Sequence, residues 1–164
     1  MTVPGPRDRD AAGRARSGRP RDELGRPLPR AAAVDVPRTP DDLVVTGAEA
    51  AELGGRLLSE GRPFHAHEVF EAAWKAVPGP ERELWRGLAQ IAVGLTHARR
   101  GNARGAVALL RRGGDHVAAF GAGSPEVDAG LVAAQAAAIA LRIERDGLAS
   151  VPADELRLRL RPAG

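Results

Sequence analysis

Cysteine is absent from this 164-residue chain, and so is any long apolar run. Without cysteine the protein forms no disulfide and has no thiol nucleophile, and a zinc site would need histidine and carboxylate ligands alone. A membrane-spanning helix needs roughly 20 consecutive apolar residues, which the sequence does not provide. The first residues also lack the apolar core of a signal peptide. We therefore expect a cytoplasmic protein without a membrane span.

Two common catalytic motifs are missing as well. Serine occurs only at positions 17, 59, 124 and 150, and none of these residues stands beside a histidine. The sequence also contains no glycine-rich phosphate-binding loop. It therefore indicates neither a Ser–His nucleophile nor a P-loop.

The net charge of +3 is distributed unevenly. Residues 1–40 hold nine arginines against five acidic residues, whereas residues 41–164 hold fifteen basic residues against sixteen acidic ones. The high pI therefore comes from the first segment. The rest of the chain gives no overall electrostatic reason to expect nucleic-acid binding.

Residues 1–40 form a leader with seven prolines, four glycines and almost no large apolar side chain. Such a segment buries too little surface to offset the entropy cost of ordering it, so we expect a disordered, flexible leader. A second interpretation is an arm that contacts an acidic partner through Arg19, Arg21 and Arg26. A third is association with RNA, which the leader's lack of aromatic residues for base stacking weakens.

From Thr46 onward the pattern becomes helical and predicts an all-α fold, a compact bundle of four to five antiparallel helices over residues 41–150. Thr46 and Glu49 form a capping box, and Asn102 is a natural N-cap after the helix stop at Gly101. The expected helix starts are Thr46, Pro63, Pro80 or Glu81, Asn102 and Ser124-Pro125, and the expected ends are Gly61, Ala76, Arg100 and Asp146-Gly147. Gly113-Gly114 is expected to break or bend the fourth helix. Residues 151–164, with the alternating run LRLRLR, are expected to form an extended or frayed tail.

The stretch HAHEVFEAAW (65–74) in the second helix concentrates polar and aromatic residues. At 100° per residue, His67 and Glu71 fall on one side of the helix together with Trp74 and other aromatic residues, and we take this side as the apolar face. His65 points almost the opposite way and is expected to be solvated. Because an inward ionisable pair is costly unless it is satisfied, the pair predicts polar partners on another helix.

The third helix offers such partners along the stripe Glu83, Gly87, Gln90, Gly94 and His97. Glycine inside a helix costs up to about 1 kcal/mol relative to alanine. Two glycines on one stripe therefore indicate close approach by another helix, or room for something bound. In this interpretation Gln90 and His97 project into the gap.

Two interpretations of these residues stay open. In the first, His67, Glu71 and His97 hold a divalent metal such as zinc, manganese or iron between the second and third helices, Glu68 is the general base, and Gln90 orients water or substrate. In the second, the same residues form a buried hydrogen-bond network that fixes helix register. The sequence HAHE is not HExxH, so it predicts no zinc protease. The remaining candidates for ligand binding or packing are Trp74, Gly87, Gly94 and Asn102.

These residues resemble a known family. HEVFEAAW followed by ELWRGLAQIAVGLTHARRGNARGA looks like the domain of unknown function 309 family, an all-helical bacterial and archaeal group, over residues 47–120. The family pattern falls on His67, Glu68, Glu71, Trp74, Gly87, Leu88, Gln90, His97, Gly101, Asn102, Gly105 and Ala106. The leader also resembles that of actinobacterial members.

The resemblance implies a compact helical bundle, and members of the family have been labelled predicted metal-dependent hydrolases. One hypothesis is therefore a metal-assisted hydrolase. The other is a non-catalytic interaction or scaffold module, because the third and fourth helices look like a single tetratricopeptide-type hairpin without further copies. Neither hypothesis fixes the partners or the oligomeric state, for which a homo-oligomer is one option.

Overall fold

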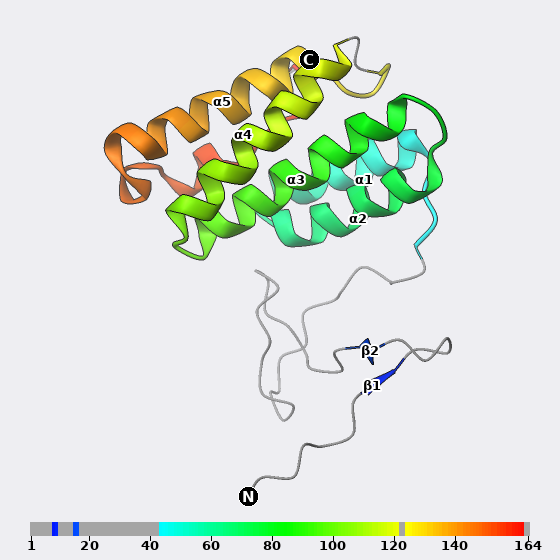
Figure 1. Ribbon diagram of the computed structural model, residues 1–164, viewed down its shortest axis with the longest axis horizontal. Helices are drawn as coiled ribbons and strands as arrows, with labels where there is room; N and C mark the ends of the chain where they lie inside the picture. Colours follow the sequence, from blue (N-terminus) through cyan, green and yellow to red (C-terminus); the bar gives the residue numbers. More distant parts are fainter. Residues whose placement is uncertain (1–7, 10–14, 17–42, 122–123, 163–164) are drawn as a thin grey trace, which may run out of the picture. The chain divides into compact units, whose positions relative to one another are not determined.

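The computed structural model describes residues 8–9, 15–16, 43–121 and 124–162. Figure 1 shows the helices of this part of the chain, which are α1 (Gly47–Ser59), α2 (Pro63–Ala76), α3 (Glu81–Arg99), α4 (Ala103–Phe120) and α5 (Ala129–Asp146). Two short 3-10 helices follow, η1 (Leu148–Ser150) and η2 (Ala153–Leu156). The predicted all-α bundle is confirmed.

The leader belongs to a separate unit, residues 1–37, while residues 38–164 form the helical unit. The described part of the leader consists of two strands of two residues each, β1 (Asp8–Arg9) and β2 (Ala15–Arg16), which pair antiparallel. The predicted partner-binding residues Arg19, Arg21 and Arg26 lie outside the described residues. No helix within residues 43–121 and 124–162 is long and apolar enough to cross a membrane.

Local capping explains why the helices start and stop where the sequence predicts. Thr46 Oγ1 accepts a hydrogen bond from the Glu49 amide at 3.2 Å, and Asn102 Oδ1 accepts one from the Gly105 amide at 2.9 Å. Each bond satisfies one of the unpaired amides of a helix N-terminus. Gly61 and Gly101 end the preceding helices with φ values of 72° and 81°, a conformation that favours glycine.

The predicted start of the fifth helix at Ser124-Pro125 is wrong. Ser124 and Val127 instead close a tight turn through two backbone hydrogen bonds of 3.1 and 3.2 Å. α5 begins only at Ala129, where Asp128 Oδ1 accepts from the Leu131 amide at 2.9 Å. Asp128 is the stronger N-cap, because its side chain satisfies a first-turn amide at the point where the helical hydrogen bonds start.

Glycines set the distance between α3 and α4. A Cβ atom on Gly87 would lie 2.7 Å from Val117 Cγ2, and one on Gly94 would lie 3.0 Å from the Leu110 backbone nitrogen. α4 runs unbroken through Gly113 and Gly114, so the expected break there does not occur. Gly113 allows the close crossing, because its missing side chain leaves space for the α3 backbone.

The core lies between the helices and includes two large aromatic side chains. Trp85 of α3 and Phe70 of α2 are fully buried, with their ring centroids 6.1 Å apart. Gly54 of α1 makes room for the Phe70 ring, since a Cβ there would be 2.3 Å from Phe70 Cε1. Phe70 of α2 therefore packs against both α1 and α3.

The tail (151–162) contains η2 and continues as an extended segment after it, and its leucines are part of the core. Leu156, Leu158 and Leu160 are buried, while the arginines between them are exposed. The side-chain amide of Gln135 in α5 makes two hydrogen bonds with the backbone of the tail, as a neighbouring strand would. Its amide nitrogen donates to the Arg159 carbonyl at 2.7 Å, and its carbonyl oxygen accepts from the Arg159 amide at 3.0 Å. The period-two pattern therefore reflects an extended segment laid on helices.

A bidentate ion pair links α4 to α5. Arg111 donates to both carboxylate oxygens of Glu144, at 2.8 and 2.7 Å. The hydrogen bonds from Arg111, followed by its charge, lower the pKa of Glu144 below its ordinary value. A carboxyl group with a lowered folded-state pKa stabilises the fold fully above its unfolded-state pKa of about 4.3 and loses that contribution as the pH falls through the folded-state value.

We therefore expect the stability difference between the native protein and Glu144→Gln to close in acid. The difference should be constant near neutral pH, begin to shrink as the pH falls below the unfolded-state pKa of about 4.3, and close once Glu144 of the native protein is also protonated. Urea unfolding at a series of pH values measures it, with Glu52→Gln as the control, because Glu52 is exposed and has no ion pair in the described part of the chain. A gap that does not change between pH 7 and pH 3 would contradict this role of the ion pair.

Candidate functional site

The buried face of α2 is not the face that the sequence suggested. The buried residues of α2 are Pro63, His65, Ala66, Val69, Phe70 and Ala73. His65, which was expected to be solvated, is only 3 % exposed, whereas the side chains of His67 and Glu71 are 22 % and 37 % exposed. The predicted orientation of the two histidines is therefore wrong. The small residues of α2 face its neighbours, and His67 and Glu71 lie at the edge of the packed surface.

The aromatic residues that misled this prediction are covered by arginines. The guanidinium carbon of Arg82 lies 5.3 Å from the centroid of the Trp74 ring, and that of Arg86 lies 5.9 Å from it. Arg82 Nε also donates to the Trp74 carbonyl at 2.8 Å. Arg100 stands 5.9 Å from the centroid of the Phe64 ring. Cation–π contacts of this kind let an aromatic ring remain half-buried at the surface without a full apolar environment.

His67 and Glu71 do form a pair, and a third residue extends it. His67 Nε2 lies 3.2 Å from Glu71 Oε2, and Lys75 Nζ lies 3.0 Å from Glu71 Oε1. His67 Nδ1 lies 3.1 Å from the Phe64 carbonyl oxygen. Both partners of the imidazole are acceptors, so the doubly protonated ring is the form that donates to both. The three side chains therefore form two consecutive i, i+4 pairs along α2.

His97 is held by its own end of α3. Asn102 Nδ2 lies 3.1 Å from His97 Nδ1, and the oxygen of the same amide caps α4. Asn102 therefore connects the end of α3 to the start of α4. Gln90 Oε1 is buried and has no hydrogen-bond partner among the described residues.

The described residues do not gather a set of metal ligands. No group of three or more histidine, cysteine, aspartate or glutamate side chains within residues 43–121 and 124–162 is placed to hold a metal ion. His67 and Glu71 are close enough to share a cation, but His97 does not complete a group of three with them. The metal-binding roles of these three residues stay predictions.

The glycines of the third-helix stripe have a packing role. Gly87 and Gly94 face α4, and a Cβ on either would meet α4 atoms at 3.0 Å or less. The expected close approach of another helix is therefore confirmed, and the space beside these two residues is filled by α4. The stripe does not open a ligand gap toward α2 at either glycine.

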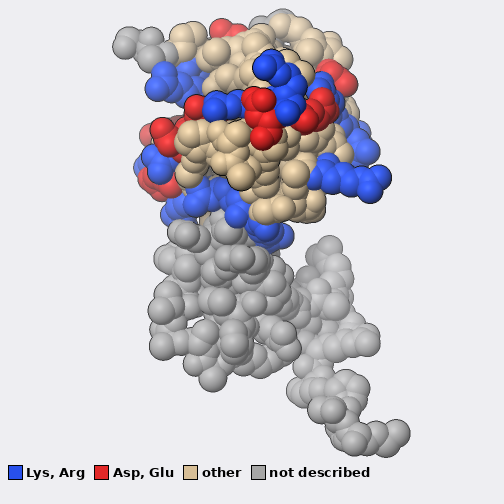
Figure 2. Space-filling view, turned by 90° about the vertical axis from the view of Figure 1, so that its left-hand side faces the viewer, with Lys and Arg blue, Asp and Glu red and all other residues tan. Residues whose placement is uncertain are grey.

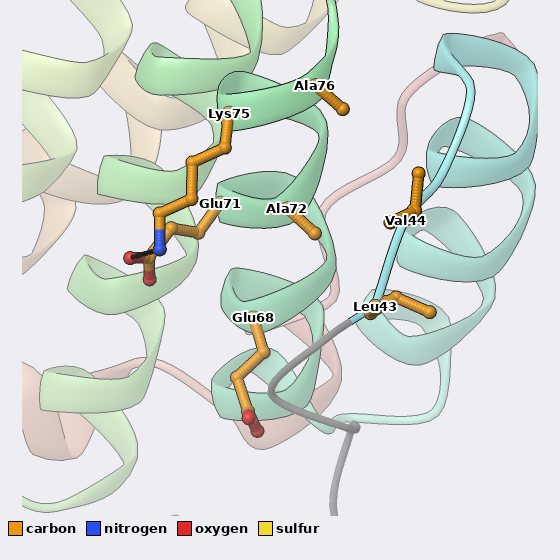
Figure 3. Close-up of a pocket in the computed structure, with 7 residues that line it drawn as sticks. All are labelled: Leu43, Val44, Glu68, Glu71, Ala72, Lys75 and Ala76. Atoms are coloured by element: carbon orange, nitrogen blue, oxygen red, sulfur yellow. Dashed lines mark ion pairs between the residues drawn. The ribbon is translucent and has the colours of Figure 1, made fainter. Parts of the chain in front are cut away.

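An open pocket of about 500 Å³ lies beside α2 and includes two of the predicted site residues. Its lining residues are Leu43, Val44, Glu68, Glu71, Ala72, Lys75 and Ala76. Figure 3 shows Ala72 and Ala76 pointing toward the segment that holds Leu43 and Val44, with the Glu71–Lys75 ion pair on the other side of the helix. Glu68 lies at one end of the pocket.

The sequence missed the apolar wall of this pocket. Leu43 and Val44 precede α1 in a segment without regular structure, so no periodicity in the sequence points to them. Val44 is 80 % exposed, which is unusual for a large apolar side chain, and it is one of two such residues in the described part of the chain.

Comparison with known families identifies the central part of this fold. Residues 52–109 match the family described as Domain of unknown function (DUF309). The matched segment runs from α1 into α4 and contains the predicted site residues of α2 and α3. No curated protein and no solved structure matches the chain. The resemblance seen in the sequence is thus confirmed.

Proposed function

For a chain whose residues 52–109 carry the domain of unknown function (DUF309), we propose a non-catalytic role, the binding of a partner protein. The ligand site is the open pocket beside α2. The ligand is an extended segment of the partner that presents a basic side chain next to an apolar one. The predicted site residues Glu68 and Glu71 would then recognise charge.

One observation carries this proposal: two carboxylates and an apolar wall line the same open pocket, with Glu71 at the edge away from that wall. Glu68 and Glu71 supply two carboxylates, and Glu71 lies within ion-pair distance of Lys75 and His67. Leu43, Val44 and the two alanines of α2 supply apolar surface. A side chain with an apolar stem and a cationic end, such as arginine or lysine, fits both features.

The Glu68→Gln/Glu71→Gln double variant tests this proposal against the matched control Glu52→Gln/Glu126→Gln, which removes the same charge elsewhere. The probes are fluorescent 12-residue peptides, one alternating arginine and leucine and one alternating glutamate and leucine, followed by anisotropy. We expect the arginine peptide to bind the native protein and the control, and to bind the pocket variant at least about tenfold more weakly, the loss of one charge-assisted contact. Equal binding of the arginine peptide to all three proteins, or equal binding of both peptides, would overturn the proposal.

A metal-assisted hydrolase is the second candidate, and the 3.2 Å separation of His67 and Glu71 is the observation that favours it. It would use Glu68 as general base and Gln90 to orient water or substrate, but the described residues supply no third ligand beside the pair. The primary proposal therefore predicts that elemental analysis after dialysis against zinc, manganese or iron finds far less than one metal ion per chain. One metal ion per chain, lost in a folded His67→Ala/His97→Ala variant, would make the hydrolase the leading candidate.

The leader is a separate matter, because Arg19, Arg21 and Arg26 lie outside the described residues. Its contact with an acidic partner stays a proposal, as do a homo-oligomeric state and a cytoplasmic location. A chain that starts at residue 41 should keep peptide binding at the α2 pocket. Any interaction that the full chain makes and this shortened chain does not make would depend on the leader.

A further inference from the structure

We propose a second binding site, for a phosphate group, at the corner where the α1–α2 turn, the end of α3 and the tail meet. The site is built by Arg99 of α3 and Arg157, which follows η2. It is separate from the α2 pocket, and nothing in the proposed function depends on it. Figure 2 looks at the end of the bundle where α1, α3 and α5 finish, and basic and acidic side chains there alternate around an uncharged surface.

The two arginines converge on Gly61. A Cβ atom on this residue would lie 2.8 Å from Arg99 Nη1 and 3.5 Å from Arg157 Nε. Because both distances start from one point, the two nitrogens can be no farther apart than the sum of the distances, about 6.3 Å. Gly61 has φ +72° and no side chain, so both guanidinium groups can approach the turn closely.

Neither arginine is neutralised within the described part of the chain. No carboxylate there forms an ion pair with Arg99 or Arg157, and Arg99 Nε is buried without a hydrogen-bond partner. Other arginines of the helical unit do have carboxylate partners, for example Arg111 with Glu144 and Arg142 with Glu155. Two like charges at this separation repel each other, and the repulsion is stronger near a protein surface than in bulk water. An anion between them would remove it.

Capping of α1 does not explain the pair. Cations do favour helix C-termini, where backbone carbonyls lack partners. In α1, however, the Arg56 carbonyl accepts from the Glu60 amide, the Leu57 carbonyl from the Arg62 amide and the Leu58 carbonyl from the Gly61 amide. These carbonyls already have backbone donors, so the guanidinium groups are not needed to satisfy them.

The chemistry of the site favours a phosphate group. Guanidinium presents a planar fork of N–H donors that matches two oxygens of one phosphate, and two such forks at this spacing suit a doubly charged anion. The positive end of the α2 dipole lies at this corner, because α2 starts directly after Gly61 and Arg62, and the C-terminal ends of α1 and α3 contribute the opposite sign. A phosphate held there would connect α3 to the tail. The phosphate can be inorganic or carried by a phosphorylated side chain.

The test compares native protein with Arg99→Gln, Arg157→Gln and the control Arg145→Gln, an exposed α5 arginine without an ion pair in the described residues. Sodium phosphate or phosphoserine replaces sodium chloride at constant ionic strength and pH, and calorimetry and thermal unfolding measure binding. We expect phosphate to raise the Tm of the native protein and the control, and each site variant to bind at least about tenfold more weakly. Stronger binding of phosphoserine than of inorganic phosphate would indicate a phosphorylated side chain as the source, and the reverse would indicate the free ion.

A structural role for the arginines predicts a different result. If Arg99 and Arg157 only support the fold, each glutamine variant should lose stability in phosphate-free buffer. If they form an anion site, relief of the repulsion leaves stability in that buffer unchanged or higher, and Arg99→Lys, which keeps the charge without the fork, binds phosphate with intermediate strength. The proposal is overturned if phosphate stabilises no more than chloride, or stabilises the native protein and both site variants equally.

Discussion

Replacing Gly113 by alanine is expected to lower the free energy of unfolding by about 2 kcal/mol, although alanine is the better helix former by about 1 kcal/mol. A Cβ on Gly113 would lie 2.8 Å from the Gly87 carbonyl oxygen, from Ile91 Cγ1 and from the Ile91 backbone nitrogen. Two of these three atoms belong to the α3 backbone, so no side-chain rotation relieves the contacts. Overpacking of this kind typically costs roughly 1–3 kcal/mol, and rigid neighbours place this case at the upper end.

The adjacent glycine provides the matched control. Gly114 occupies the next position of α4, and its Cβ would meet Ala136 Cβ at 3.4 Å and the Ala133 carbonyl oxygen at 3.9 Å, both ordinary contacts. Gly114→Ala should therefore raise stability, by up to about 1 kcal/mol, through helix propensity alone. Urea unfolding followed by the fluorescence of the buried Trp85 measures both variants. Equal shifts in the same direction would contradict the close α3–α4 crossing.

These glycines show what the sequence could predict about packing. The stripe of Gly87 and Gly94 on α3 indicated close approach by another helix, and the structure confirms it. The sequence could not say which helix approaches, because a stripe on one helix carries no information about its partner. The interpretation that placed α2 there came from the polar residues of α2, whereas the α4 glycine that completes the contact was expected to break its helix.

The helix boundaries could be predicted more fully than the faces of the helices. Boundaries depend on local chemistry, such as the Thr46 and Asn102 caps, and on glycines at positive φ. The inward face depends on what surrounds the helix. α2 carries Phe64 and Trp74 on its outer side and mainly small residues, together with Phe70, on its buried side. Periodicity gives the large residues more weight. Arginines from α3 cover Trp74, so its side of α2 can stay at the surface.

For the candidate sites, too, local contacts could be predicted from the sequence and long-range contacts could not. Glu68 and Glu71 share a pocket because they lie one turn apart on α2, which the spacing in the sequence showed. Leu43 and Val44 complete the pocket from a segment without regular structure, and Arg99 and Arg157 meet from positions far apart in the chain. Contacts of the second kind depend on the tertiary fold and leave no local signal in the sequence.

The tail gives the second large expected effect, since Leu158→Ala should lower the free energy of unfolding by about 2–4 kcal/mol. Leu158 is 1 % exposed, in a segment that the sequence described as extended or frayed. Truncating a buried leucine loses the transfer free energy of its side chain and adds the cost of the cavity left behind. Both contributions arise only if the tail is docked on the helices. The two hydrogen bonds between Gln135 and the Arg159 backbone hold the tail in that position.

The control for this variant is Leu141→Ala, which makes the same chemical change at an α5 position that is 47 % exposed. It should cost less than about 1 kcal/mol, because little apolar surface returns to water. Urea unfolding gives both values, and hydrogen exchange at the Arg159 amide reports locally on the tail. If Leu158→Ala costs no more than Leu141→Ala and the Arg159 amide exchanges freely, the tail is frayed in solution. The Arg157 half of the proposed phosphate site would then lose its support, because an undocked tail cannot hold two guanidinium groups together.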